Sequence, residues 1–128
     1  MTQRTHLGID AELVGTVTSL GSGTATVSLV ATPSMTADDR GLVHGGFTFG
    51  LADYAAMCAV NDPNVVLGGA DTRFLAPVIA GQEMVATATV TGQKGRKRTV
   101  TVAVTVEDRE VMTGTFTTFV LDQHVLDG

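Results

Sequence analysis

The chain has 128 residues, a length typical of one domain that can bury a core without metal ions or disulfide bridges. Hydrophobic residues make up 44% and charged residues 16% of the chain, which excludes an intrinsically disordered protein. The net charge of −5 disfavours general nucleic-acid binding, and the single cysteine, Cys58, excludes a disulfide framework.

The chain order of apolar and polar residues predicts one helix and about six strands. The predicted strands are residues 13–20, 24–31, 65–77, 83–91, 99–106 and 111–121. A polar connector at 33–40 leads to the helix, 46–60, which ends where Pro63 follows. Polar turns are expected at 92–97 and 107–110. No apolar run reaches about 18 residues and the first ten residues resemble no signal peptide, so we expect a cytoplasmic protein with no membrane partner.

The last three predicted strands alternate valine and threonine, which is typical of a half-buried antiparallel sheet. The helix is apolar on all sides and has no hydrophilic face for water. We therefore expect a single α+β domain over residues 1–128, in which the antiparallel sheet wraps around one central helix.

Asp53 is the one charged residue of this apolar helix, about two turns from a glycine-rich start. An unpaired buried charge is costly, so a chemical role is the favoured interpretation. A structural carboxylate bonded to backbone N–H groups is the alternative.

The order of elements, together with Val43-His44-Gly45-Gly46 and Leu51-Ala52-Asp53, resembles the hotdog fold. Within that fold, the chain is similar to the phenylacetic-acid-degradation-type acyl-CoA thioesterases, whose pattern is His-Gly-Gly followed by Leu-Ala-Asp on the same helix. Asp53 lies nine positions after His44, as the pattern expects, and Phe74 begins a similar strand ending. The resemblance covers residues 13–121. It implies hydrolysis of acyl-CoA to a free acid and coenzyme A, without a metal ion or any cofactor beyond the substrate.

Chemistry supports the same roles for these residues. Free N–H groups at a helix start favour an anion, so Gly45 and Gly46 can hold the oxygen of the attacked thioester carbonyl. Asp53 then acts as a nucleophile or as a general base on water. His44 is a candidate catalytic residue of the motif, although bracing the glycine turn is its simpler role. Phe47 and Phe74 are candidates to line an apolar acyl pocket.

The spacing of these groups predicts an oligomer. Gly45 and Asp53 are eight residues apart, or roughly 12 Å along a helix, which is too far for one carbonyl group to touch both. A two-fold homodimer with antiparallel helices would bring Asp53 of one protomer to Gly45 of the other. We expect residues 65–75 to pair across this dimer, with further association into a homotetramer plausible, and Asp71 to pair with Arg73 near the seam.

Charged residues mark two more candidate binding positions. Related thioesterases carry Asn or Gln six residues before the motif histidine, where this chain has Asp38, an acceptor that could bind His44. Four basic residues gather near one turn and predict an anion site for coenzyme A phosphates, with a solvated hairpin as the alternative. They are Lys94, Arg96, Lys97 and Arg98.

Two classes of function therefore remain. An acyl-CoA thioesterase is favoured, because a mere binder needs no buried carboxylate at the scissile bond. The alternative is a non-catalytic acyl-CoA-binding hotdog module, such as a sensor or storage protein.

Overall fold

A computed structural model describes all 128 residues. It contains one long helix, α2 (Gly45–Val60), one short helix, α1 (Ala11–Val14), and a six-stranded sheet. The strands are β1 (Thr16–Gly21), β2 (Thr24–Val30), β3 (Val65–Phe74), β4 (Glu83–Lys94), β5 (Lys97–Val106) and β6 (Arg109–Val120). Their order in the sheet is β1-β2-β4-β5-β6-β3, and every neighbouring pair is antiparallel.

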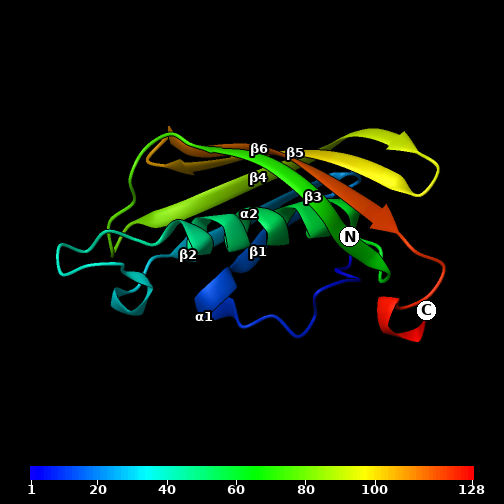
Figure 1. The fold of residues 1–128 in the computed structure, drawn as a ribbon, viewed down its shortest axis with the longest axis horizontal. Coiled ribbons are helices and arrows are strands. Elements are labelled where there is room, and N and C mark those ends of the chain that lie inside the picture. Colours follow the sequence, from blue (N-terminus) through cyan, green and yellow to red (C-terminus); the bar gives the residue numbers. More distant parts are fainter.

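The sheet curves around α2, and the N-terminal segment runs along the other side of that helix (Figure 1). Every residue from Leu51 to Ala59 is buried except Asp53. The valines of β5 at 100, 102, 104 and 106 are buried as well, which confirms the alternation predicted for that strand. These features confirm the predicted hotdog fold, with the core between α2 and the inner face of the sheet.

The prediction was wrong where the first strand begins. Leu13 and Val14 belong to α1, because the Asp10 side chain accepts a hydrogen bond from the N–H of Glu12 and caps this helix. The helix ends at Gly15, whose φ of 126° suits glycine, and a Cβ there would lie 2.8 Å from Val27. An apolar pair beside a capping residue therefore formed a helical turn instead of a strand.

Other boundaries moved by a few residues. The central helix starts at Gly45, one residue before the prediction, and β3 ends at Phe74 instead of at Pro77. A short 3₁₀ helix, Pro33–Met35, lies within the predicted connector. The fourth and fifth strands extend to Lys94 and Lys97, so the predicted turn at 92–97 shortens to two residues.

β3 is an edge strand, since it pairs with β6 on one side and with no strand on the other. Its residues 67–71 are exposed, and so are the large apolar side chains of Leu67, Phe74 and Leu75. Soluble proteins usually protect such an edge with charge, proline or a covering segment. No helix of the structure has the length and apolar character needed to cross a bilayer.

Candidate functional site

The first end of the site is the start of α2. His44 precedes the helix without a side-chain cap, and its backbone N–H is bonded to the carbonyl of Met35 at 2.9 Å. The N–H of Phe47 donates to the carbonyl of His44 at 3.1 Å. The N–H groups of Gly45 and Gly46 have no acceptor within the chain. Two free donors therefore stand at the positive end of the helix dipole.

Aromatic rings surround these two donors. The His44 ring lies over Gly46, where a Cβ would be 3.0 Å from its Nε2, and it meets the Phe47 ring edge-on at 6.3 Å between centroids. The Phe74 ring lies against Gly45, where a Cβ would be 3.3 Å from it. The structure thus brings five predicted site residues together, and the ring of His44 is placed to brace the glycine turn.

Asp38 has a different environment from the one expected. Its Oδ1 accepts hydrogen bonds from the N–H groups of Arg40 at 3.0 Å and Leu42 at 3.2 Å. It makes no bond to His44, so that expectation was wrong: the carboxylate orders the exposed loop before α2. A short carboxylate of this kind commonly bonds backbone N–H groups two to four residues ahead.

Asp53 forms the second end of the site. Its Oδ1 is buried and has no hydrogen-bond partner, the only such side-chain atom in the chain. Burial disfavours the charged form and raises the pKa of this carboxyl from 3.8 to about 6. A basic and unpaired oxygen is the arrangement expected of a group that awaits a substrate or a water molecule.

Asp53 faces a cavity of about 430 Å³. Its walls are Thr5 and His6 of the N-terminal segment, Met57 of α2, residues 63–67 at the start of β3, and the C-terminal His124 and Val125. His6 and His124 are not predicted from the sequence. Neither belongs to a motif, and each reaches the cavity through chain segments far from α2 in sequence, so no local signal indicates them.

At the β4–β5 turn, two of the four basic side chains, Arg96 and Arg98, are bound to other groups of the chain. Arg96 forms the one ion pair of the chain, with Asp122. Arg98 donates to the carbonyls of Gly95 at 2.7 Å and Lys97 at 3.2 Å. Lys94 and Lys97 have no ion-pair partner. Two of the four basic side chains thus bind groups of the chain itself, Arg96 remains exposed, and the ammonium groups of Lys94 and Lys97 have no ion-pair partner.

The hairpin also lies close to the Asp53 cavity. Arg96 and Asp122 line a neighbouring hollow of about 370 Å³, and His124 and Val125 line both spaces. Figure 1 shows the β4–β5 turn and both chain termini at the same end of the molecule. The Asp53 cavity and the hollow beside the basic turn are therefore neighbours, separated by His124 and Val125.

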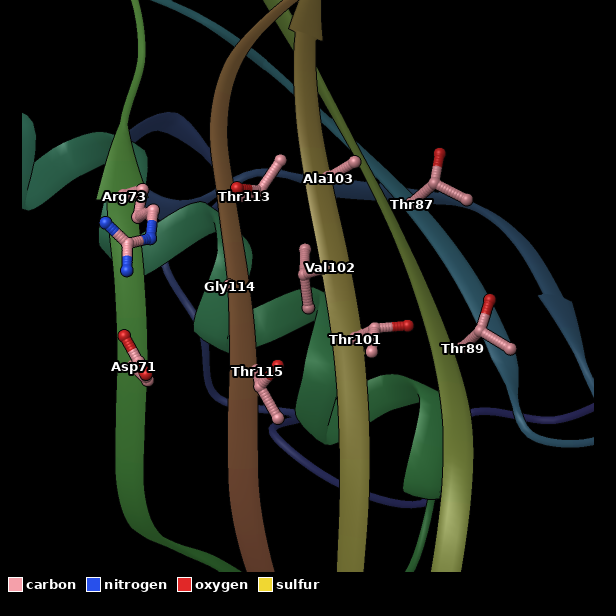
Figure 2. A pocket seen from close by; sticks show the side chains of 10 residues that line it. All are labelled: Asp71, Arg73, Thr87, Thr89, Thr101, Val102, Ala103, Thr113, Gly114 and Thr115. Carbon is pink, nitrogen blue, oxygen red and sulfur yellow. The ribbon is translucent and has the colours of Figure 1, made fainter.

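Asp71 and Arg73 lie on the outer face of the sheet, beside threonines of β4, β5 and β6 (Figure 2). They form no ion pair, so that prediction was wrong. The hollow that they line measures about 550 Å³ and is larger than the Asp53 cavity. Five of its ten lining residues are threonines, and it has no buried unpartnered side-chain atom like Oδ1 of Asp53. No cluster of three or more His, Cys, Asp or Glu side chains is arranged to hold a metal ion.

Comparison with known proteins gives the family. Residues 34–112 match the MaoC like domain. The structure superimposes with a TM-score of 0.98 and 49% identity on an uncharacterized protein, PH1136, from Pyrococcus horikoshii, covering 99% of this chain and 98% of that one. A mutant of the phenylacetic acid degradation protein PaaI from Thermus thermophilus gives a TM-score of 0.78 at 31% identity, over 85% of this chain and 95% of that one.

Two curated relatives are longer than this chain. Methylthioribose-1-phosphate isomerase from Aquifex aeolicus (strain VF5) is 50% identical over 120 residues, which are 93% of this chain and 26% of that protein. Transcription factor FapR from Caldanaerobacter subterraneus subsp. tengcongensis is 31% identical over 124 residues, 96% of this chain and 61% of that protein. An isomerase, a transcription factor and a degradation protein are all similar to this chain, so the choice of function rests on its own site residues.

Proposed function

Because the chain belongs to the family of MaoC-like domains, we propose that it is a hotdog acyl-CoA thioesterase of the phenylacetic-acid-degradation type, with residues 1–128 as one domain. The observation that carries the proposal is the buried and unpartnered Oδ1 of Asp53. A domain that only binds acyl-CoA gains nothing from this oxygen, since it destabilises the fold when ionised. The 31% identity to the phenylacetic acid degradation protein PaaI supports membership in the family that the His-Gly-Gly and Leu-Ala-Asp motif indicates.

The reaction needs a base and an anion site. Asp53, with a pKa near 6, is mostly ionised at neutral pH and either attacks the thioester carbonyl or removes a proton from water. The negative charge that develops on the carbonyl oxygen is held by the free N–H groups of Gly45 and Gly46. Such donors are typically worth about 3 kcal/mol of transition-state stabilisation. The activity is expected to fall as the pH drops through about 6 and Asp53 becomes protonated.

In a two-fold dimer, Asp53 of one protomer and the glycine N–H groups of the other would act on one substrate. β3 runs from the Asp53 cavity, which residues 65–67 line, to Phe74, which lies against Gly45. Antiparallel pairing of two β3 edges would set Phe74 of one protomer beside residues 65–67 of the other. The partner's glycine donors would thereby approach Asp53. This arrangement would also cover the exposed Leu67 and Phe74 side chains.

Coenzyme A fits the remaining features of this end of the molecule. Its phosphates would meet Lys94, Lys97 and the exposed Arg96 at the β4–β5 turn, and its thioester would reach the Asp53 cavity. The wall shared by the two hollows supports this path. Apolar side chains, including Phe47 and Phe74, would receive the acyl group.

Release of free thiol from a panel of acyl-CoAs tests the proposal. The wild type should hydrolyse at least one of them, and Asp53→Asn should lower kcat by about 10²-fold or more. Asp108→Asn is the matched control, because Asp108 is exposed in the β5–β6 turn and its side chain forms no ion pair. It should retain wild-type kcat.

Binding of the same acyl-CoAs separates the two classes of function. If neither the wild type nor Asp53→Asn releases thiol but acyl-CoA still binds, the thioesterase proposal fails and the protein is a binding module. Labelled acyl-enzyme trapped in the wild type would identify Asp53 as the nucleophile instead of the base.

A further inference from the structure

The N-terminal segment is bonded to the C-terminal half of α2, which begins at Asp53 near the middle of the helix. Asn61 terminates this helix in the left-handed conformation, at φ 54°. Its Oδ1 accepts from the N–H of Arg4 at 2.7 Å, and its Nδ2 donates to the carbonyl of Thr2 at 2.9 Å. Gln3 donates to the Tyr54 hydroxyl at 3.0 Å. These bonds give residues 2–5 a fixed position on the helix.

This attachment delivers His6 to the wall of the Asp53 cavity. His6 has a φ of 55°, a left-handed conformation that residues other than glycine adopt infrequently. Its Nδ1 lies 2.8 Å from Oγ1 of the buried Thr5, and its ring lies 6.1 Å from that of Tyr54. Nε2 is the ring nitrogen without a hydrogen bond. Backbone outliers of this kind gather at functional sites.

Asp53 and His6 therefore line one cavity, and each has a polar atom without a hydrogen-bond partner, the buried Oδ1 of Asp53 and Nε2 of His6. We propose that His6 is a second catalytic residue of this site, and that its imidazole and the carboxylate of Asp53 hold the attacking water between them. The inference rests on the proposed thioesterase function and on its general-base form. This role requires the tautomer in which Nδ1–H donates to the Thr5 hydroxyl, because Nε2 is then the acceptor.

The hydrolysis then balances as follows. The water oxygen forms a bond to the thioester carbon, and its proton passes to Asp53 while its second O–H donates to Nε2 of His6. The tetrahedral intermediate collapses with cleavage of the carbon–sulfur bond. The departing thiolate takes the proton from Asp53, so the free acid and coenzyme A are formed and the carboxylate is restored. His6 orients the water and is not itself protonated.

The charge states of both groups suit these roles at neutral pH. Burial lowers the pKa of His6, which keeps the ring neutral, and raises that of Asp53 to about 6. Two further titratable groups face His6 or line the cavity. Tyr54 packs on the ring from α2, and burial raises its pKa, so it stays protonated. His124 lines the C-terminal wall, where its Nδ1 accepts from Leu126.

The test compares His6→Leu with His6→Gln in acyl-CoA hydrolysis across pH 4.5 to 8. Leucine offers no acceptor, so kcat should fall by about 10²-fold with KM changed less than about twofold. Glutamine can still accept through its side-chain oxygen and should stay within about tenfold of wild type. Leu7→Ser is the matched control, because Leu7 is the exposed next residue and should leave kcat unchanged.

The pH profile gives a readout that mere packing would not change. In the wild type, two groups must lose their protons, so log kcat/KM should rise with a slope approaching two on the acid side. In His6→Gln only Asp53 remains, and the slope should approach one. His124→Gln should keep the slope of two, which assigns the second proton to His6.

Several outcomes overturn the inference. His6→Leu with wild-type kcat and slope would show that the ring is only part of the wall. Thr5→Val, which removes the hydroxyl that holds Nδ1, provides a second variant if His6→Leu fails to fold. A folded Thr5→Val with wild-type kcat and pH profile would be equally contrary. If the wild type releases no thiol from any acyl-CoA, the proposed thioesterase function itself fails. If the wild type is active and the His6 variants match it, only the role of His6 fails.

Discussion

Replacement of Asp53 by Asn should stabilise the protein at neutral pH while it lowers kcat by about 10²-fold or more. The carboxyl is buried, its Oδ1 has no partner, and its pKa rises from 3.8 to about 6. At about 1.4 kcal/mol per pH unit, this rise corresponds to about 3 kcal/mol by which the ionised form opposes folding. Asparagine has nearly the same shape and never ionises, so the variant avoids this penalty.

The pH dependence follows from the sign of the pKa change. Below pH 3.8 the carboxyl is protonated in both the folded and the unfolded chain, and the penalty is absent. It grows as the pH rises from 3.8 to about 6 and is complete above that range. Asp53→Asn should therefore exceed the wild type in stability by up to about 3 kcal/mol at pH 7.5. The two proteins should converge near pH 3.8.

Urea unfolding at a series of pH values measures this difference. Asp108→Asn serves as the control, because its exposed carboxyl should give no pH-dependent gain. If Asp53→Asn is equally or less stable than the wild type at pH 7.5, the carboxylate has a stabilising partner in the folded protein. The reasoning from an unpaired buried charge would then be refuted.

Three further variants test other parts of the site. Gly45→Ala should lower kcat at least about tenfold, because the added Cβ lies 3.3 Å from the Phe74 ring beside the free N–H groups. The thermal unfolding temperature should change little. Unchanged kinetics would exclude the start of α2 as the oxyanion site. Arg96→Ala should raise KM for acyl-CoA with kcat nearly unchanged. For an acyl-pantetheine substrate, which lacks the nucleotide phosphates, KM should not change. A KM for acyl-CoA equal to that of the wild type would show that the β4–β5 turn is only solvated. Ala70→Pro, in the exposed middle of β3, should give a monomer by light scattering and remove activity; a monomer with full activity would defeat the shared site.

The fold was predictable because its signals are local and repeated. The valine alternation at 100–106 and the continuous apolar run of α2 each indicate one structure, and the two together require a sheet around a helix. Leu13 and Val14 were misassigned because two apolar residues suit a strand and a helix equally well. The cap at Asp10 and the turn at Gly15 decided between them.

The candidate site was predictable only where a motif marks it. His44, Gly45 and Asp53 share one pattern, whereas His6 enters through contacts between residues more than fifty positions apart, such as those of Asn61 with Thr2 and Arg4. Their geometry depends on how the N-terminal segment packs, which no short pattern encodes. The Asp38 interpretation failed for a related reason: the nearest backbone N–H groups were better partners than a side chain farther along.

Mixing two inactive variants tests the central claim, a site shared between protomers, most directly. Asp53→Asn lacks the base, and Gly45→Val blocks the N–H donors, so each homodimer should be inactive. Equal mixing after dissociation makes about half of the dimers mixed, and each mixed dimer contains one intact site in a two-fold arrangement. Thiol release should then recover to about a quarter of the wild-type value. Mixed dimers with no recovered activity would contradict a site built from Gly45 of one protomer and Asp53 of the other.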